Sequence, residues 1–175
     1  LLKNMPAKES FVIVDVKKEV LGSVVRITVV VEPALKAEVQ KAISLAFAEC
    51  ERLDKNYSRF RKNNKLSALN EKIDKWQKVD EEFFFLLEEG EKVFLKTDGA
   101  FNLGVKSLLE QWGYDQNYSF KPSSQKNILN EVSTLKNPPY QLGKDYSVKV
   151  FYPIELGGLG KGYALDLMVE SLQNF

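Results

Sequence analysis

The order of strand-like and helical segments along this chain predicts an α+β fold. Two segments rich in Val and Ile, Phe11–Lys17 and Val24–Glu32, alternate in polarity and are separated by the break Leu21-Gly22-Ser23. Helical segments follow, and one further strand-like segment, "YSVKVFYPIEL", comes only near the end. Because strands and helices do not alternate regularly, a doubly wound parallel sheet is not expected.

The first helices are predicted from apolar spacing and from capping residues. Pro33 opens a helix in which apolar residues recur close to the 3.6-residue period of an α-helix: Leu35, Val39, Ala42, Ile43, Ala46, Cys50 and Leu53. Further on, "KLSALN" predicts a short helical turn. Asp80 is a good N-cap for the next helix, which is expected to run to Thr97 and to stop at Asp98-Gly99.

The last part of the chain predicts two more helices before a strand. "LGVKSLLEQWGYD" predicts a short helix closed by Gly113. "SSQKNILNEVSTLK" predicts an amphipathic helix after a loop over residues 114–123. The strand expected over Tyr146–Leu156 then runs into a glycine-rich stretch that precedes a final helix.

Composition excludes several classes of chemistry. With 175 residues, 44% of them apolar, the chain is long enough for one substantial core or two small ones. A net charge of +1 on a mixed surface gives no electrostatic footprint for nucleic acid, and no apolar run approaches the ~20 residues of a membrane span. The sequence has no histidine, which excludes Ser-His-Asp triads and histidine-ligated zinc. The lone Cys50 falls on an apolar helical stripe, where a buried, inert thiol is expected.

The stretch "ELGGLGKGYALD" holds the densest cluster of glycine, with four of the six residues from Gly157 to Gly162. It is not a P-loop, because Glu155 stands at the first glycine position and Gly162 replaces the Ser or Thr. It also lacks the G-x-G-x-x-G spacing of a dinucleotide site. Two interpretations stay open from spacing alone. One is an anion site with Lys161 at a helix N-terminus, and the other is a tight turn in which glycines let two backbones touch.

Three segments together resemble the ApbE family of FAD:protein FMN transferases, also called flavin transferases and formerly thiamine biosynthesis lipoprotein ApbE. They are "LDKNYSRFRKNNKLSALN", "KTDGAFNLGVKSLLEQWGYD" and "IELGGLGKGYALD", in the order and spacing of that family. Leu21-Gly22-Ser23 resembles the family's Met-Gly-Thr turn. The resemblance runs from Val20 to the end of the chain.

The resemblance implies a magnesium-dependent transferase. Such an enzyme cleaves the diphosphate of FAD, attaches FMN to a Thr or Ser of a client flavoprotein and releases AMP. The implied fold is ApbE-like, an antiparallel or mixed sheet with flanking helices. Residues 1–175 are expected to be its N-terminal portion, without the part that carries a histidine-bearing loop and an Asp/Thr pair of metal ligands. Alone, they are expected neither to turn over nor to hold Mg²⁺ well.

The resemblance also implies which residues bind FAD in the first two thirds of the chain. Leu21 stands where the family Met contacts the flavin, with a core position at a strand break as the alternative. Phe60 stands where an aromatic ring stacks on the isoalloxazine, and its alternative is an ordinary core aromatic. Ala100, Phe101 and Asn102 match a turn that runs along FAD. Asn102 replaces the usual Asp, which puts any role of a charged carboxylate there in doubt.

The glycine stretch supplies the remaining implied site residues. Glu155 stands where a carboxylate hydrogen-bonds the cofactor, and Gly158 where a backbone carbonyl coordinates Mg²⁺. Lys161 is expected both to bind the diphosphate and to act in catalysis by stabilising the charge that develops on it. The alternative for Lys161 is a surface lysine at a helix start.

Two other functions stay open at this level. One is a catalytically inactive FAD-binding module, and the other is a non-enzymatic interaction domain. The expected partners are FAD and a client flavoprotein with an acceptor Thr or Ser, with no nucleic acid. The resemblance further implies a place in the cell envelope, on the exported side of the cytoplasmic membrane, with a possible lipid anchor upstream of this chain. A cytoplasmic location stays open.

Overall fold

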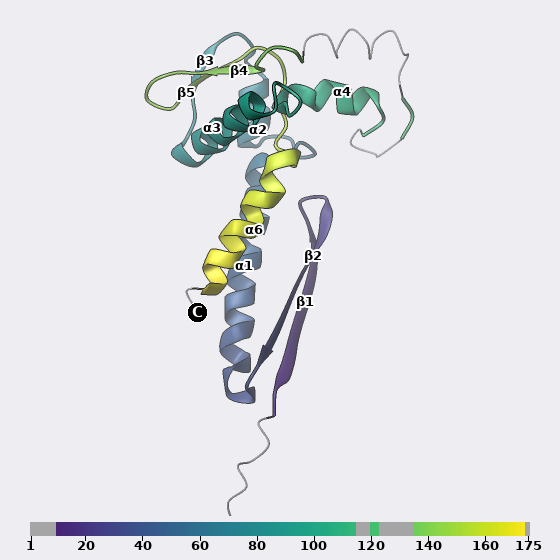
Figure 1. Ribbon diagram of the computed structural model, residues 1–175, viewed down its shortest axis with the longest axis vertical. Helices are drawn as coiled ribbons and strands as arrows, with labels where there is room; N and C mark the ends of the chain where they lie inside the picture. The colour runs from purple at the N-terminus through teal and green to yellow at the C-terminus, as the bar shows by residue number, and fades with distance from the viewer. Residues whose placement is uncertain (1–9, 115–119, 123–134, 174–175) are drawn as a thin grey trace, which may run out of the picture. The chain divides into compact units, whose positions relative to one another are not determined.

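The computed structural model describes residues 10–114, 120–122 and 135–173, coloured along the chain in Figure 1. The chain divides into two compact units. The N-terminal unit comprises Leu1–Asp54 and Lys161–Phe175, and the central unit comprises Lys55–Gly160. Both contain helices and antiparallel strands, so the predicted α+β class is confirmed.

The N-terminal unit begins with a two-stranded hairpin. β1 (Val12–Val20) pairs antiparallel with β2 (Ser23–Val31). Leu21 and Gly22 form a two-residue turn in which both have positive φ, +56° and +64°. This conformation matches the twist of the flanking strands, but it costs a leucine roughly 1 kcal/mol. Because the turn is so tight, β1 extends three residues beyond the end that alternation predicts.

The helices of the N-terminal unit bury the apolar stripe predicted from the sequence. A short 3₁₀ turn, η1 (Pro33–Leu35), precedes α1 (Lys36–Tyr57). The buried stripe comprises Val39, Ala42, Ile43, Ala46, Cys50 and Leu53, whereas Leu35 is exposed. Cys50 is free and buried, as predicted, and its burial raises the pKa of its thiol. The last helix, α6 (Gly157–Gln173), begins in the central unit and belongs to the N-terminal unit from Lys161 onward.

The helices of the central unit begin at capping residues. α2 (Lys65–Asn70) starts with a capping box, in which the side chains of Asn64 and Ser67 each accept the other's backbone N–H. α3 (Glu81–Lys96) starts at Asp80, whose carboxylate accepts the N–H of Phe83 at 2.9 Å. Burial alone would raise the pKa of Asp80, but the bonds from Lys65 and the Phe83 amide outweigh it and lower the pKa.

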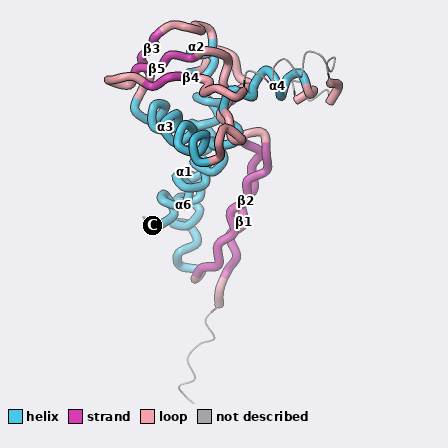
Figure 2. Tube along the Cα trace, turned by 45° about the horizontal axis from the view of Figure 1, so that its top comes forward, coloured by secondary structure: helices cyan, strands magenta, loops and turns pink. Residues whose placement is uncertain are grey.

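A three-stranded antiparallel sheet completes the central unit, with α3 beside it (Figure 2). Its order is β3 (Trp76–Lys78), β5 (Ser147–Val150), β4 (Tyr140–Leu142). The buried hydroxyl of Tyr140 ties the sheet to the helix by donating to the carbonyl of Leu87 at 2.7 Å. β3 and β4 were not predicted, because three residues are too few for alternation to show. β5 is shorter than predicted, since regular pairing ends at Val150.

The connection between α3 and β4 contains a second 3₁₀ turn. η2 (Leu103–Val105) leads into α4 (Lys106–Gln111), which is followed by Gly113 at φ +86°, as predicted. The helix expected over residues 123–136 lies almost wholly outside the described residues. Within the described ranges, no helix combines the length and apolarity that a membrane crossing requires.

Candidate functional site

The glycine-rich stretch lies inside α6 rather than before it, which corrects the expectation of a glycine loop. Gly157, Gly158, Gly160 and Gly162 occupy the first two turns of the helix. Each glycine in a helix interior costs about 1 kcal/mol relative to alanine, so propensity alone does not start a helix here. A side-chain cap helps it to start, because the carboxylate of Glu155 accepts the N–H of Gly157 at 2.8 Å.

Two distant segments hold the chain that enters α6. The side-chain amide of Asn70, at the end of α2, donates to the carbonyl of Ile154 at 2.8 Å. The same side chain accepts the N–H of Ile154 at 2.9 Å. One residue later, the N–H of Glu155 donates to the carbonyl of Leu103 at 2.8 Å. Ile154 and Glu155 are therefore fixed by α2 and η2 before the helix begins.

The first turn of α6 is open to solvent and lies against an aromatic ring. Gly157 and Gly158 are both exposed. A Cβ on Gly158 would come within 3.0 Å of the Phe101 ring, and one on Gly157 within 2.6 Å of a Glu155 oxygen. Close approach within the central unit therefore accounts for these two glycines.

The next two glycines are not explained by packing among the described residues. A Cβ on Gly160 would meet its nearest neighbour, Leu156, at 4.0 Å, and one on Gly162 would meet nothing within 4 Å. The N–H of Gly158 has no backbone partner among the described residues. Lys161 is exposed and has no ion pair with any described residue. The helix thus starts with an uncovered backbone donor and an unpaired cation in its first two turns.

Asn102 is buried, and its side chain is bonded on both sides to protein backbone. Its amide nitrogen donates to the carbonyls of Leu135 at 2.8 Å and Asn137 at 3.3 Å. Its carbonyl oxygen accepts the N–H of Gly104 at 2.8 Å and caps η2. An aspartate offers no such donors when ionised, so an amide rather than a carboxylate suits these contacts. Asn102 positions the turn that carries Phe101 and Leu103.

The other predicted cofactor residues of the central unit lie on its surface or half-buried. Ala100 is exposed. The ring of Phe60 is half-buried and lies 4.4 Å from the guanidinium carbon of Arg59, a cation–π contact. A hollow of 260 Å³ opens beside this loop and is rich in basic residues. Its lining comprises Ser58, Arg59, Arg61, Lys62, Leu66, Ser67, Asn70, Glu71, Lys106 and Pro153.

Leu21 belongs to the N-terminal unit, at the tip of the hairpin. It is half-buried and has the positive φ described above. A hollow of 400 Å³ at this turn is lined by residues 19–24 and by Asp54, which is only 8% exposed. The turn therefore combines an uncommon backbone conformation with a neighbouring buried carboxyl group, features that are concentrated at functional sites.

The structure thus brings together part of the predicted set of site residues. Within the central unit, Phe101 lies against Gly158 and Glu155 caps Gly157 at the start of α6. Asn102 instead caps η2, from which the carbonyl of Leu103 accepts the N–H of Glu155. Asn70, which fixes Ile154, was not singled out from the sequence. A polar residue that ends the apolar turn "KLSALN" is the signal that could have identified it.

Among the described residues, no three or more His, Cys, Asp or Glu side chains gather into a potential metal site. The predicted ligand, the carbonyl of Gly158, lies in an α-helix, where it accepts the amide of Gly162. A cation there would have to use its second lone pair. Among the described residues, Gly158 therefore has no cluster of carboxylates beside it to complete a cation site.

Comparison with known proteins identifies the family to which this chain belongs. The model of the ApbE family matches residues 21–175, and the chain belongs to this family. The ApbE protein from Thermotoga maritima is 27% identical and superposes with a TM-score of 0.79 over 93% of this chain. Flavin transferase ApbE from Vibrio cholerae superposes with a TM-score of 0.76 at 18% identity, and flavinyl transferase ApbE from Pseudomonas stutzeri with 0.73 at 17%. Each of these two matches covers 94% of this chain.

The chain spans about half the length of these structures, 53% of the Thermotoga maritima protein and 54% of the other two. A comparison with curated protein sequences found no match. The resemblance noted in the sequence is confirmed at the level of family and fold. The roles of individual residues stay predictions.

Proposed function

We propose that this chain is part of an FAD:protein FMN transferase, which attaches FMN to a client flavoprotein. In the reaction, the hydroxyl oxygen of a client Thr or Ser forms a bond to the phosphorus of the FMN half. The diphosphate P–O bond breaks and AMP leaves. Membership of the ApbE family, with flavin transferases among the matched structures, supports the assignment.

The observation that carries the proposal is the uncovered start of α6. Gly158 offers a backbone N–H without a backbone partner among the described residues, and Lys161 follows in the same helix. Backbone donors and the positive end of a helix dipole favour anions such as a diphosphate. A cation at this end of a helix is unfavourable unless an anion offsets it, so a ligand phosphate would account for Lys161.

Glu155 places a constraint on how FAD lies in this site. Its carboxylate is 5% exposed and already accepts the N–H of Gly157. A carboxylate only accepts hydrogen bonds and repels phosphate oxygens. We therefore assign Glu155 to an N–H or O–H donor of the cofactor, on the nucleotide or the flavin, and the diphosphate to Gly158 and Lys161.

Magnesium is part of the proposal, and it would neutralise the charge of the diphosphate when bound. Of the described residues, Gly158 would contribute one backbone oxygen. Mg²⁺ prefers six oxygen ligands, usually with one or two carboxylates among them. The remaining protein ligands would have to come from outside the described residues, so no catalytic step is assigned to the metal here.

The test is a transfer assay with the complete protein. The protein is mixed with FAD, Mg²⁺ and a candidate client, and the client's intact mass is measured for an added FMN. Transfer is expected with FAD but not with FMN, which has no diphosphate to cleave, and not with a client whose acceptor Thr is replaced by Val. Lys161→Gln should abolish or strongly reduce transfer, whereas the matched surface variant Lys96→Gln should not.

Each alternative function predicts a different outcome of the same assay. FAD binding without transfer to any client would indicate a binding module that has lost activity. A complete protein that does not bind FAD at all would favour an interaction domain and overturn the proposal.

A further inference from the structure

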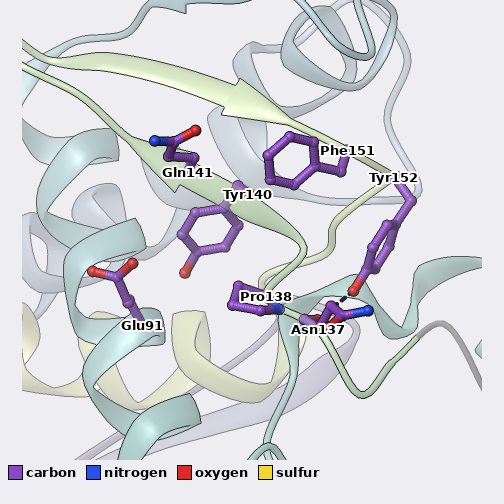
Figure 3. Close-up of a pocket in the computed structure, with 7 residues that line it drawn as sticks. All are labelled: Glu91, Asn137, Pro138, Tyr140, Gln141, Phe151 and Tyr152. Atoms are coloured by element: carbon purple, nitrogen blue, oxygen red, sulfur yellow. Dashed lines mark hydrogen bonds between the residues drawn. The ribbon is translucent and has the colours of Figure 1, made fainter.

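A second pocket lies in the central unit, apart from the start of α6. It has a volume of 480 Å³ and opens between α3, β4 and the segment after β5 (Figure 3). None of the predicted cofactor residues lines it. Its lining comprises Glu91, Asn137, Pro138, Tyr140, Gln141, Phe151 and Tyr152.

The charge of this pocket is carried by one carboxyl group. Glu91 is its acidic lining residue, and no lining residue is basic. Glu91 is half-buried and has no hydrogen bond or ion pair with any described residue. Burial, and then the charge of Glu91, raise the pKa of the neighbouring Tyr140 phenol. The pocket therefore presents an uncompensated negative charge in partly desolvated surroundings.

Phe151 is the exposed aromatic ring of the pocket, whereas Tyr140 is buried, and the tyrosine hydroxyls are already used as donors. The hydroxyl of Tyr140 is used by the carbonyl of Leu87, and that of Tyr152 by the carbonyl of Asn137. Phe151 and Pro138 add apolar surface, and Figure 3 shows their rings beside that of Tyr140. The electron-rich face of an aromatic ring attracts cations.

Phe151 already takes part in such an interaction on this unit's surface. The Nζ of Lys149 lies 5.5 Å from the centre of its ring. Lys149 itself is paired with Asp74 at 3.3 Å and does not line the pocket. Its ammonium therefore leaves the charge of Glu91 unpaired.

We propose that this pocket binds an elongated organic cation, an alkylguanidinium or alkylammonium group, with its head at Glu91 and its stem on the rings of Phe151 and Pro138. The carboxylate suits a guanidinium or ammonium head, to which it accepts charge-assisted hydrogen bonds. These two rings suit a methylene stem, because long cationic side chains bury their stems against apolar surface. Phosphates and other anions are excluded by the charge of Glu91.

This ligand chemistry has two sources, a free amine and an Arg or Lys side chain of a protein. Agmatine, a free alkylguanidinium, is the probe for the first source. The capped tripeptide acetyl-Gly-Arg-Gly-amide is the probe for the second, and the same peptide with neutral citrulline in place of arginine is its control. Binding is measured by titrating each probe into the protein and following backbone amide shifts by NMR.

We expect saturable shifts at the amides of Gln141 and Phe151 with at least one cationic probe. A stronger response to agmatine would identify a free amine as the ligand, and a response to the peptide at least as strong would identify a protein side chain. The proposal is overturned if neither cation binds, or if the citrulline peptide binds as tightly as the arginine peptide.

Two substitutions locate the cation. Glu91→Gln keeps the shape of the side chain but removes its charge, so the affinity for the cationic probe should fall about tenfold. Phe151→Leu should lower it about threefold. Glu81→Gln, an exposed carboxylate on the same helix and outside the pocket, should leave it unchanged. An unchanged affinity in a folded Glu91→Gln variant would contradict the assignment.

Discussion

Two glycine-containing regions of this protein use glycine for opposite reasons. In η2, a Cβ on Gly104 would overlap the Tyr152 ring and come within 2.9 Å of Pro139. In the second turn of α6, a Cβ on Gly160 or Gly162 would meet no atom closer than 4.0 Å. The first glycine is required by packing that the structure describes. The other two are not, although they weaken the helix that contains them.

The difference separates structural from functional explanations of a glycine. Where neighbouring side chains fill the space of a Cβ, stability alone accounts for the residue. Where that space is open, something other than internal packing has to account for it, such as a ligand or another part of the protein. In this chain the open positions fall next to Lys161, which the proposed function already assigns to the diphosphate.

The largest expected effect is on stability, at the closely packed Gly104. Gly104→Ala should lower the free energy of unfolding by about 3 kcal/mol, because an aromatic ring and a proline ring must both move. Gly160→Ala, the matched control, should not destabilise the protein and should gain up to about 1 kcal/mol of helix propensity. Urea denaturation of both variants measures the difference. Equal unfolding free energies for the two variants would break the comparison.

The polar contacts that hold the same turn predict a second effect. Asn102→Asp should destabilise the protein by about 1–3 kcal/mol near neutral pH, because the amide donors to Leu135 and Asn137 are lost. Facing carbonyl oxygens, the new carboxyl would have a folded-state pKa above its unfolded value of about 3.9. Stability should therefore be recovered as the pH falls below that folded-state pKa.

Denaturation at pH 7 and pH 4 checks this sign. Asn137→Asp is the control, because the structure uses the backbone carbonyl of Asn137 and leaves the residue exposed. A larger destabilisation of Asn102→Asp at pH 4 than at pH 7 would show that the donors are not what matters.

At Gly162, where a Cβ has room, a substitution should raise stability and lower the affinity for FAD. Gly162→Ala should stabilise the protein by up to about 1 kcal/mol, since its Cβ has room. If the uncovered helix face receives FAD, the same variant should bind FAD more weakly in a calorimetric titration. Unchanged FAD affinity in the complete protein would show that Gly162 is not kept for the ligand.

The smallest effect concerns the exposed hairpin, where contacts are local. The pKa of Asp15 is lowered to about 2, by hydrogen bonds from Arg26 and Thr28. Its stabilising contribution is present above the unfolded-state pKa of 3.8 and is lost as the pH falls from 3.8 towards 2. In Arg26→Gln the pKa should rise towards 3.8, which an NMR titration of the Asp15 carboxyl carbon measures. A pKa that stays near 2 would assign the shift to Thr28 alone.

The parts of the fold that could be predicted from sequence are those specified by nearby residues. α2 and α3 begin where Asn64 and Asp80 cap them, and α1 buries the stripe read from its apolar period. β3 and β4 escaped prediction because each is three residues long and is defined by its pairing with β5. The helices could be predicted from local sequence patterns, whereas the short strands are defined by pairing between distant segments.

The candidate site divides in the same way. The resemblance identified the family correctly, because its motifs are contiguous in the sequence. The expectation of a glycine loop was wrong, because glycine is a poor helix former and the anchor at Asn70 lies 84 residues from Ile154. The contacts of Asn102 lie 33 and 35 residues away, a distance that no local pattern spans.

The side chain of Asn70 makes both hydrogen bonds to the backbone of Ile154 that a neighbouring β-strand would otherwise make. Asn70 and Ile154 are 84 residues apart in the sequence. The position at which α6 begins therefore depends on a residue at the end of α2, far away in the sequence. Replacement of this one asparagine would leave the entry to α6 held by the bond from the Glu155 N–H to the carbonyl of Leu103.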